Sequence, residues 1–230
     1  MMRRRSWSKI HRHAELMHRW KALCQGLGLN ARLAHLQGQG LINSWDHLPR
    51  HYHDTTHLMA CLGGLDQVKN QMQDPNAAEL ALWFHDAIYW PRRKDNEERS
   101  AQWAAQFMTT AGLPVTQRDQ VVRLILETKH SARPSQGDAR FVIDIDLGIL
   151  GQNDAAYKAF ERNVRKEYRW VPWIDYVKRR SAVLQSFLDR PRIYSTDWFR
   201  ERLETQARSN LQRQIELLLP PLGITDTTRF

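Results

Sequence analysis

The segment LWFHDAIYWPRRKDNEERSA, residues 82–101, places a His-Asp doublet, His85 and Asp86, at the close of an apolar run. The preceding residues are apolar nearly all round a helix, so we expect a central helix over residues 77–89. An imidazole and a carboxylate at the end of a buried segment need partners, because an unpaired buried charge is costly. A metal ion would satisfy both groups.

A second histidine pair stands about thirty residues earlier in RHYHDTTHL, residues 50–58. Residues four apart share one face of a helix, so His53 and His57 point the same way if the helix has begun by His53. The two histidine motifs follow each other closely enough to belong to one site.

The later segment FVIDIDLGIL, residues 141–150, has the β-branched residues of a strand. No second strand of similar quality occurs for it to pair with, so we interpret it as a buried helix. Asp144 or Asp146 would then supply a fourth group. Two imidazoles and two carboxylates suit an octahedral Mn²⁺, Fe²⁺, Ni²⁺, Mg²⁺ or Zn²⁺ ion, with positions left for water and a substrate oxygen.

The two cysteines, Cys24 and Cys61, both lie in segments of helical pattern. This placement argues against a structural disulfide, and the number of cysteines excludes a thiolate zinc site. We therefore expect nitrogen and oxygen ligands for any metal.

The helical spacing of apolar residues along the chain predicts an all-α fold, and the length of 230 residues predicts one domain over residues 1–230. The chain is 42% hydrophobic and 26% charged, which is ordinary for a globular protein. The metal-site core should span about residues 45–150, with further helices over about 155–218. An early helix from Asn30 should end near Gly38 or Gly40. No apolar run approaches the length of a membrane span, and a signal-peptide pattern is missing, so we expect no membrane association and a cytoplasmic protein.

The formal net charge is +9 and the sequence pI is about 9.9. Acidic residues are interleaved with the arginines, which favours a solvated basic surface. Attraction of an anionic substrate or of RNA is the alternative.

The order His, His-Asp, Asp resembles the HD superfamily of metal-dependent phosphohydrolases, an all-α fold. The segments YHDTTHL, LWFHDAIY, NEERSA and IDIDLGILG, with Tyr168, Tyr176 and RSNL at residues 208–211, resemble a bacterial group of predicted HD-superfamily phosphohydrolases. The likeness covers roughly residues 45–215. It implies four metal ligands: His57, His85, Asp86 and Asp146. Asp146 is preferred to Asp144 because the pattern Asp-x-x-Ile-Leu-Gly resembles that of the superfamily's final aspartate.

The segment from Tyr52 to His57 is similar to the Tyr-His-Asn-x-x-His element of cyclic-nucleotide phosphodiesterases. In that element the first histidine protonates the leaving oxygen, so the resemblance makes His53 the general acid. Asp54 stands where asparagine is usual, which weakens a detailed cyclic-nucleotide analogy.

Further residues are candidates for the same site. Glu97 is a candidate base or water-orienting residue, whereas Glu98 is expected to cap its helix with Asp95. His130 is a candidate ligand to phosphate or to a second metal ion. A basic loop could clamp phosphate or could simply be solvated: Arg92, Arg93 and Lys94.

These observations predict hydrolysis of a phosphomonoester or phosphodiester of a nucleotide by attack of a metal-bound hydroxide. A di-iron oxygenase of the same fold is one alternative, but only His130 lies between Asp86 and Asp146 as a further histidine ligand. A non-enzymatic nucleotide- or RNA-binding module is another, in which aromatic residues near Tyr168 to Trp173 would stack on bases. At helical spacing these aromatic residues are more often part of a core.

Overall fold

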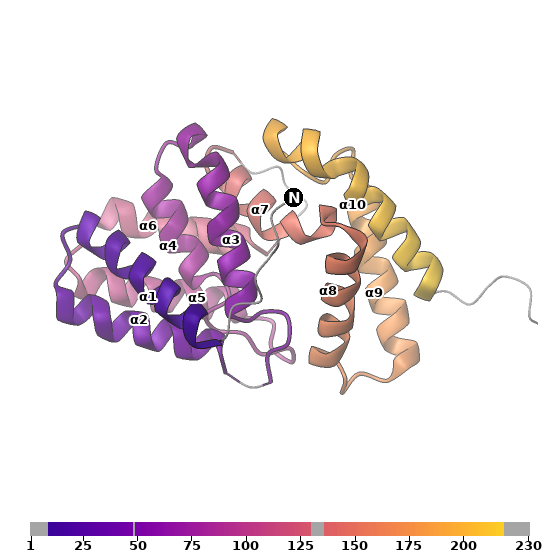
Figure 1. Ribbon diagram of the computed structural model, residues 1–230, viewed down its shortest axis with the longest axis horizontal. Coiled ribbons are helices and arrows are strands. Elements are labelled where there is room, and N and C mark those ends of the chain that lie inside the picture. The colour runs from indigo at the N-terminus through magenta and orange to yellow at the C-terminus, as the bar shows by residue number, and fades with distance from the viewer. Residues whose placement is uncertain (1–8, 48, 130–135, 219–230) are drawn as a thin grey trace, which may run out of the picture. The chain divides into compact units, whose positions relative to one another are not determined.

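The computed structural model describes residues 9–47, 49–129 and 136–218 (Figure 1). These residues form ten α-helices and two short 3-10 helices, with no strand among them. The all-α prediction is therefore confirmed. The chain divides into two compact units, Met1–Asp146 and Leu147–Phe230. That the chain forms one domain stays a prediction.

The first unit contains seven α-helices among its described residues. Their bounds, with those of one short 3-10 helix, are α1 Lys9–Gly26, α2 Ala31–Trp45, α3 Thr55–Val68, η1 Lys69–Gln71, α4 Pro75–Phe84, α5 Asn96–Thr110, α6 Val115–Glu127 and α7 Ala139–Asp146. Asp54 caps α3 by accepting from the backbone N–H groups of Thr56 and His57. Such a cap satisfies donors that the first helical turn leaves unpaired.

Helix α4 is the centre of this unit, as its all-round apolar pattern predicts, and it packs against α3, α5, α6 and α7. Every residue from Leu80 to Phe84 is fully buried. The helix begins at Pro75, where Asp74 provides the cap, and ends at Phe84, earlier than expected. His85 and Asp86 therefore lie just beyond the helix, in a turn.

Two tryptophans fix helices around α4. The indole of Trp45 donates to the carbonyl of Trp83 at 3.0 Å, and the indole of Trp20 donates to the carbonyl of Ala34 at 2.7 Å. Helix α2 runs to Trp45 instead of ending near Gly38 or Gly40. The reason is that Trp45 completes a buried contact that outweighs the low helix propensity of two glycines.

Helix α7 confirms the helical interpretation of the aspartate-containing segment. Its residue Ile145 packs over Gly64 of α3, where an added Cβ would lie 3.4 Å from the isoleucine. At its start, Asp138 accepts from the backbone N–H groups of Gln73 and Asp74 at 2.9 and 2.7 Å. Both contacts fix the helix whose last residue is Asp146.

The second unit consists of η2 Leu147–Gly151, α8 Asp154–Glu167, α9 Trp173–Leu188 and α10 Asp197–Leu218. Asn210 of α10 is fully buried and donates to the carbonyls of Leu150 and Gln152, at 2.8 Å each. Gly151 allows α10 to approach η2, since a Cβ there would lie 2.5 Å from that of Leu203.

The described helices also bear on the membrane prediction. The most apolar of them, α4, has only 10 residues. A bilayer core needs about 20. In the part of the chain that the structure describes, no helix combines the length and the apolar character that a membrane span requires. The cytoplasmic location stays a prediction.

Candidate metal centre

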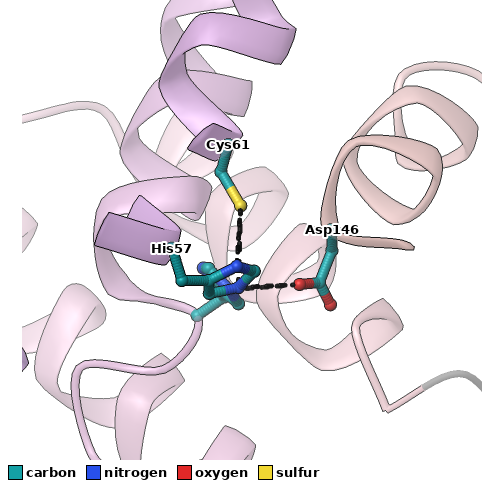
Figure 2. A group of neighbouring side chains, drawn as sticks. His57, Cys61 and Asp146 are labelled. Carbon is teal, nitrogen blue, oxygen red and sulfur yellow. Dashed lines mark hydrogen bonds and ion pairs between the residues drawn. The ribbon is translucent and has the colours of Figure 1, made fainter. Parts of the chain in front are cut away.

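Side chains from three separate segments of the first unit converge on one point. His57 and Cys61 come from α3, His85 follows α4, and Asp146 ends α7. One potential ligand atom from each lies within 4.8 Å of all the others. Figure 2 shows the Cys61 sulfur and the Asp146 carboxylate approaching the His57 ring from different directions. The group could hold a metal ion.

The spacing of the nitrogen and oxygen atoms fits shared coordination. His57 Nε2 lies 3.0 Å from Asp146 Oδ1 and 3.3 Å from His85 Nε2. His85 Nε2 lies 3.6 Å from the same Asp146 oxygen. Ligand atoms at about 2.1 Å from one ion are about 3.0 Å apart in an octahedron and about 3.4 Å apart in a tetrahedron. The donor set therefore fits a divalent ion.

The tautomer of His85 is set by the backbone. Its Nδ1 lies 2.8 Å from the carbonyl oxygen of Leu82, which can only accept a hydrogen bond. Nδ1 therefore carries a proton, and in the neutral ring the lone pair of Nε2 faces the carboxylates. A backbone carbonyl on the remote nitrogen is the usual support of a metal-binding histidine.

The cluster needs a positive charge. Burial opposes protonation of His85, but the carboxylates of Asp86 and Asp146 outweigh it and raise the pKa of His85 to about 9. Without a metal ion, a proton on His85 Nε2 supplies the charge that separates the neighbouring acceptors. A divalent cation would replace that proton.

Three of the four predicted ligands belong to the group of four, and the fourth lies beside it. His57, His85 and Asp146 belong to the group of four. Asp86 stands beside it, with Oδ2 at 3.4 Å from His85 Nε2 and a side chain 13% exposed. Asp144, the alternative to Asp146, is fully buried in the same helix and is not a member of the group.

Cys61 was missed, because the sequence interpretation admitted only nitrogen and oxygen ligands. Its sulfur lies 3.6 Å from Nε2 and 3.8 Å from Nδ1 of His57. These nearly equal distances place the sulfur over the ring and away from the lone-pair direction of Nε2. Burial and the charges of Asp146 and Asp86 raise the pKa of the Cys61 thiol well above its ordinary value. The four-residue spacing from His57 on one helix is the signal that could have found it.

His53 lies beside this group, but a shared helix face with His57 is not the reason. Helix α3 begins at Thr55, so His53 precedes it and the shared helix face does not apply. The rings of His53 and His57 are nevertheless 5.9 Å apart. His53 stacks on Tyr89 with ring centres 4.0 Å apart, which holds the imidazole near the His85-Asp86 turn.

Glu97 and Glu98, at the start of α5, lie in different environments. Glu97 is half-buried, and burial together with the charge of Asp86 raises the pKa of its carboxyl. Glu98 does not form the expected cap; it pairs with Lys129, and the Asp95 side chain makes no cap hydrogen bond. Lys129, two residues beyond the end of α6, offers Glu98 a stronger, charged partner.

The proposed phosphate-binding loop is exposed at Arg92, Arg93 and Lys94. Arg93 forms two hydrogen bonds of 2.7 Å to Asp95, so a bound phosphate would have to compete with that carboxylate. His130 lies outside the described residues.

Three polar residues that hold the turn after α4 were not recognised from the sequence. Arg50 binds the carbonyls of Asp86 and Ala87 at 2.7 and 2.8 Å. Ser100 accepts from the Ile88 N–H at 3.0 Å. Asn96 accepts from the Trp90 N–H and donates to the Trp90 carbonyl, both at 3.1 Å. The signal that could have found them is the chain segment after α4. Its backbone N–H and C=O groups need side-chain partners once the helix has ended.

Comparison with protein-family models, with curated proteins and with solved structures finds no match for this chain. The structure thus defines an all-helical protein with a buried His, Cys, His and Asp cluster that could bind a metal ion. Such a protein is compatible with an HD-type fold.

Proposed function

We propose that the protein is a metal-dependent phosphohydrolase of the HD type, acting on a phosphomonoester or phosphodiester of a nucleotide. The observation that carries this proposal is the convergence of His57, His85 and Asp146 at 3.0 to 3.6 Å. The three residues come from segments far apart in sequence, in the order that the superfamily resemblance implies. Asp86 stands beside them.

The ion would be held by His57, His85, Asp86 and Asp146, with Cys61 as a neighbouring thiol. When bound, it would polarise a phosphoryl oxygen and lower the pKa of a water molecule. Buried imidazole and carboxylate ligands suit Mn²⁺, Fe²⁺, Ni²⁺, Mg²⁺ or Zn²⁺. The proposal includes one ion and allows a second.

His53 is the proposed proton donor to the leaving oxygen. It lies beside His57, with ring centres 5.9 Å apart, and does not belong to the four-residue group. Stacking on Tyr89 fixes the position of the imidazole. A general acid needs such a fixed position within reach of the leaving oxygen.

The remaining charged residues would serve the substrate. Glu97, with its raised pKa near Asp86, is the proposed base or water-orienting group. The exposed loop of Arg92, Arg93 and Lys94 would attract phosphate, as would the formal charge of +9 over the whole chain. Binding of RNA is the less favoured use of the same charge.

The test is phosphate release from nucleotides, dinucleotides and an aryl phosphate by metal-stripped protein reloaded with Mn²⁺. Asp86→Ala should lose both metal and turnover. His53→Ala should keep the metal, and its turnover rate should fall by at least about 100-fold. His47→Ala is the matched control, since His47 is exposed and its ring lies 5.5 Å from that of Trp90, away from the four-residue group. Its rate should match the wild type.

The outcomes separate the alternatives. Turnover by the wild type but not by Asp86→Ala would support a metal phosphohydrolase. No phosphate release from a demonstrably metal-loaded wild type would contradict the proposal, and oxygen uptake by the iron-loaded protein would then identify an oxygenase. An undiminished rate of His53→Ala on a substrate with a poor leaving group would remove the role of His53.

A further inference from the structure

Arg50 connects the two histidine segments through their backbones. Its Nη1 donates to the carbonyl of His53 at 3.1 Å and to that of Asp86 at 2.7 Å, and its Nη2 donates to the carbonyl of Ala87 at 2.8 Å. The guanidinium also lies 5.5 Å from the ring centre of Trp45 and 5.7 Å from that of Tyr89. One rigid cation thus contacts both segments.

Neither segment is held by a helix at these positions. His53 precedes α3, which begins at Thr55, and Asp86 follows α4, which ends at Phe84. Carbonyls beyond a helix end lack the helical N–H partners and need others. A positive charge at the carboxyl end of α4 also complements the helix dipole. Arg50 therefore supplies a charged partner to the backbone of each segment beyond the bounds of the two helices.

We propose that Arg50 is a positioning residue that sets the spacing between the His53 segment and the His85-Asp86 turn. The role in metal binding rests on the function proposed above, whereas the link between the backbones does not. The planar fork of arginine can bind carbonyls on two segments at once, and the single ammonium of lysine cannot reproduce that geometry.

Ser100 provides the matched control. It exchanges hydrogen bonds with the backbone of Ile88, at 3.0 Å as acceptor and 3.3 Å as donor, and is fully buried. It therefore supports the same turn as Arg50. The described hydrogen bonds give it no contact with the His53 segment. Loss of Ser100 should loosen the turn alone, and loss of the Arg50 fork should loosen both segments together.

Amide hydrogen exchange of the metal-free protein tests this difference. In Arg50→Lys, the amides of residues 51–57 and of residues 85–90 should both exchange at least about tenfold faster. The reason is that local opening of these segments no longer has to break the charged hydrogen bonds of Arg50. In Ser100→Ala, only the second peptide should change. Unchanged exchange over residues 51–57 in a folded Arg50→Lys protein would overturn the proposal. Arg50→Gln, which removes the charge, provides a second folded variant if the lysine form does not fold.

Metal affinity gives the second measurement, by competition with a chromophoric chelator. The affinity of Arg50→Lys for Mn²⁺ should be at least about tenfold lower than that of the wild type, as is usual when a group that orients a metal ligand is lost. Unchanged affinity would overturn the role in metal binding. A wild type that binds no metal would contradict the proposed function instead, and the exchange result would still decide whether Arg50 couples the two segments.

Discussion

His57 and His85 direct their Nε2 atoms at each other across 3.3 Å. The backbone carbonyl at His85 Nδ1 leaves Nε2 of its neutral ring as an acceptor, and Asp146 Oδ1 lies within 3.6 Å of both Nε2 atoms. Two imidazoles and a carboxylate this close favour a positive charge among them. A proton can fill that place in the metal-free protein, and a divalent ion can fill it better.

Removal of one imidazole should therefore abolish tight metal binding. His85→Gln should lower the affinity for Mn²⁺ or Zn²⁺ by more than about 100-fold, since even outer-shell changes cost about 10- to 100-fold. His47→Gln should bind as the wild type does. Metal content after dialysis, together with calorimetric titration, measures both. Equal metal content in the two variants would refute the site.

The stability of the metal-free protein should fall as pH rises. The pKa of His85 in the folded protein is about 9, above its ordinary 6.5, so folding takes up a proton between these values. The stabilisation is fully present below pH 6.5 and is lost as pH rises through 9. It amounts to about 3 kcal/mol at most.

Urea unfolding at pH 6 and at pH 9.5 measures this loss. His85→Gln should reduce the pH dependence, because the titrating group is absent. Bound metal should reduce it in the wild type, since the ion replaces the proton. An identical pH dependence in the wild type and in His85→Gln would assign it to other groups.

Two glycines of α2 should respond oppositely to alanine. A Cβ at Gly38 would lie 2.5 Å from Cδ1 of the buried Trp20, whereas one at Gly40 would lie 3.7 Å from Trp103. Gly38→Ala should destabilise the protein by about 1–3 kcal/mol through overpacking. Gly40→Ala should stabilise it by about 0.5–1 kcal/mol through helix propensity. Thermal unfolding decides, and stabilisation by both substitutions would show that Trp20 can move.

The second unit should depend on a buried ion pair. Arg180 of α9 donates to both carboxylate oxygens of Glu161 of α8, at 3.1 and 2.6 Å. The hydroxyl of Tyr157 donates to Glu161 at 2.9 Å. Glu161→Gln leaves the buried guanidinium without its countercharge and should cost about 3 kcal/mol.

The control for that pair is Lys158→Gln on the same helix. Lys158 pairs with Asp154 at 2.8 Å, but both side chains are about half exposed. Its loss should cost less than about 1 kcal/mol. Denaturant unfolding compares the two variants, and equal losses would argue that burial does not strengthen the Glu161 pair.

Much of the fold follows from local pattern. The apolar run before His85 predicted the central helix α4, and the lack of a partner strand predicted helix α7 from a β-branched segment. The ends of α4 and α2 were placed wrongly. Helix ends depend on caps and on distant contacts, such as the hydrogen bond from Trp45 to Trp83, which the local sequence does not specify.

The sequence by itself determined the all-α class and joined His57, His85 and one of Asp144 and Asp146 in one site, because residue type and order along the chain suffice for that. The choice of Asp146 rests on the superfamily resemblance. Only the tertiary structure added Cys61 to the cluster and made Arg50 the link between the His53 segment and the turn after α4. The reason is physical. A helix pattern specifies which face is buried, whereas the distance between two atoms on different segments depends on how the whole core packs.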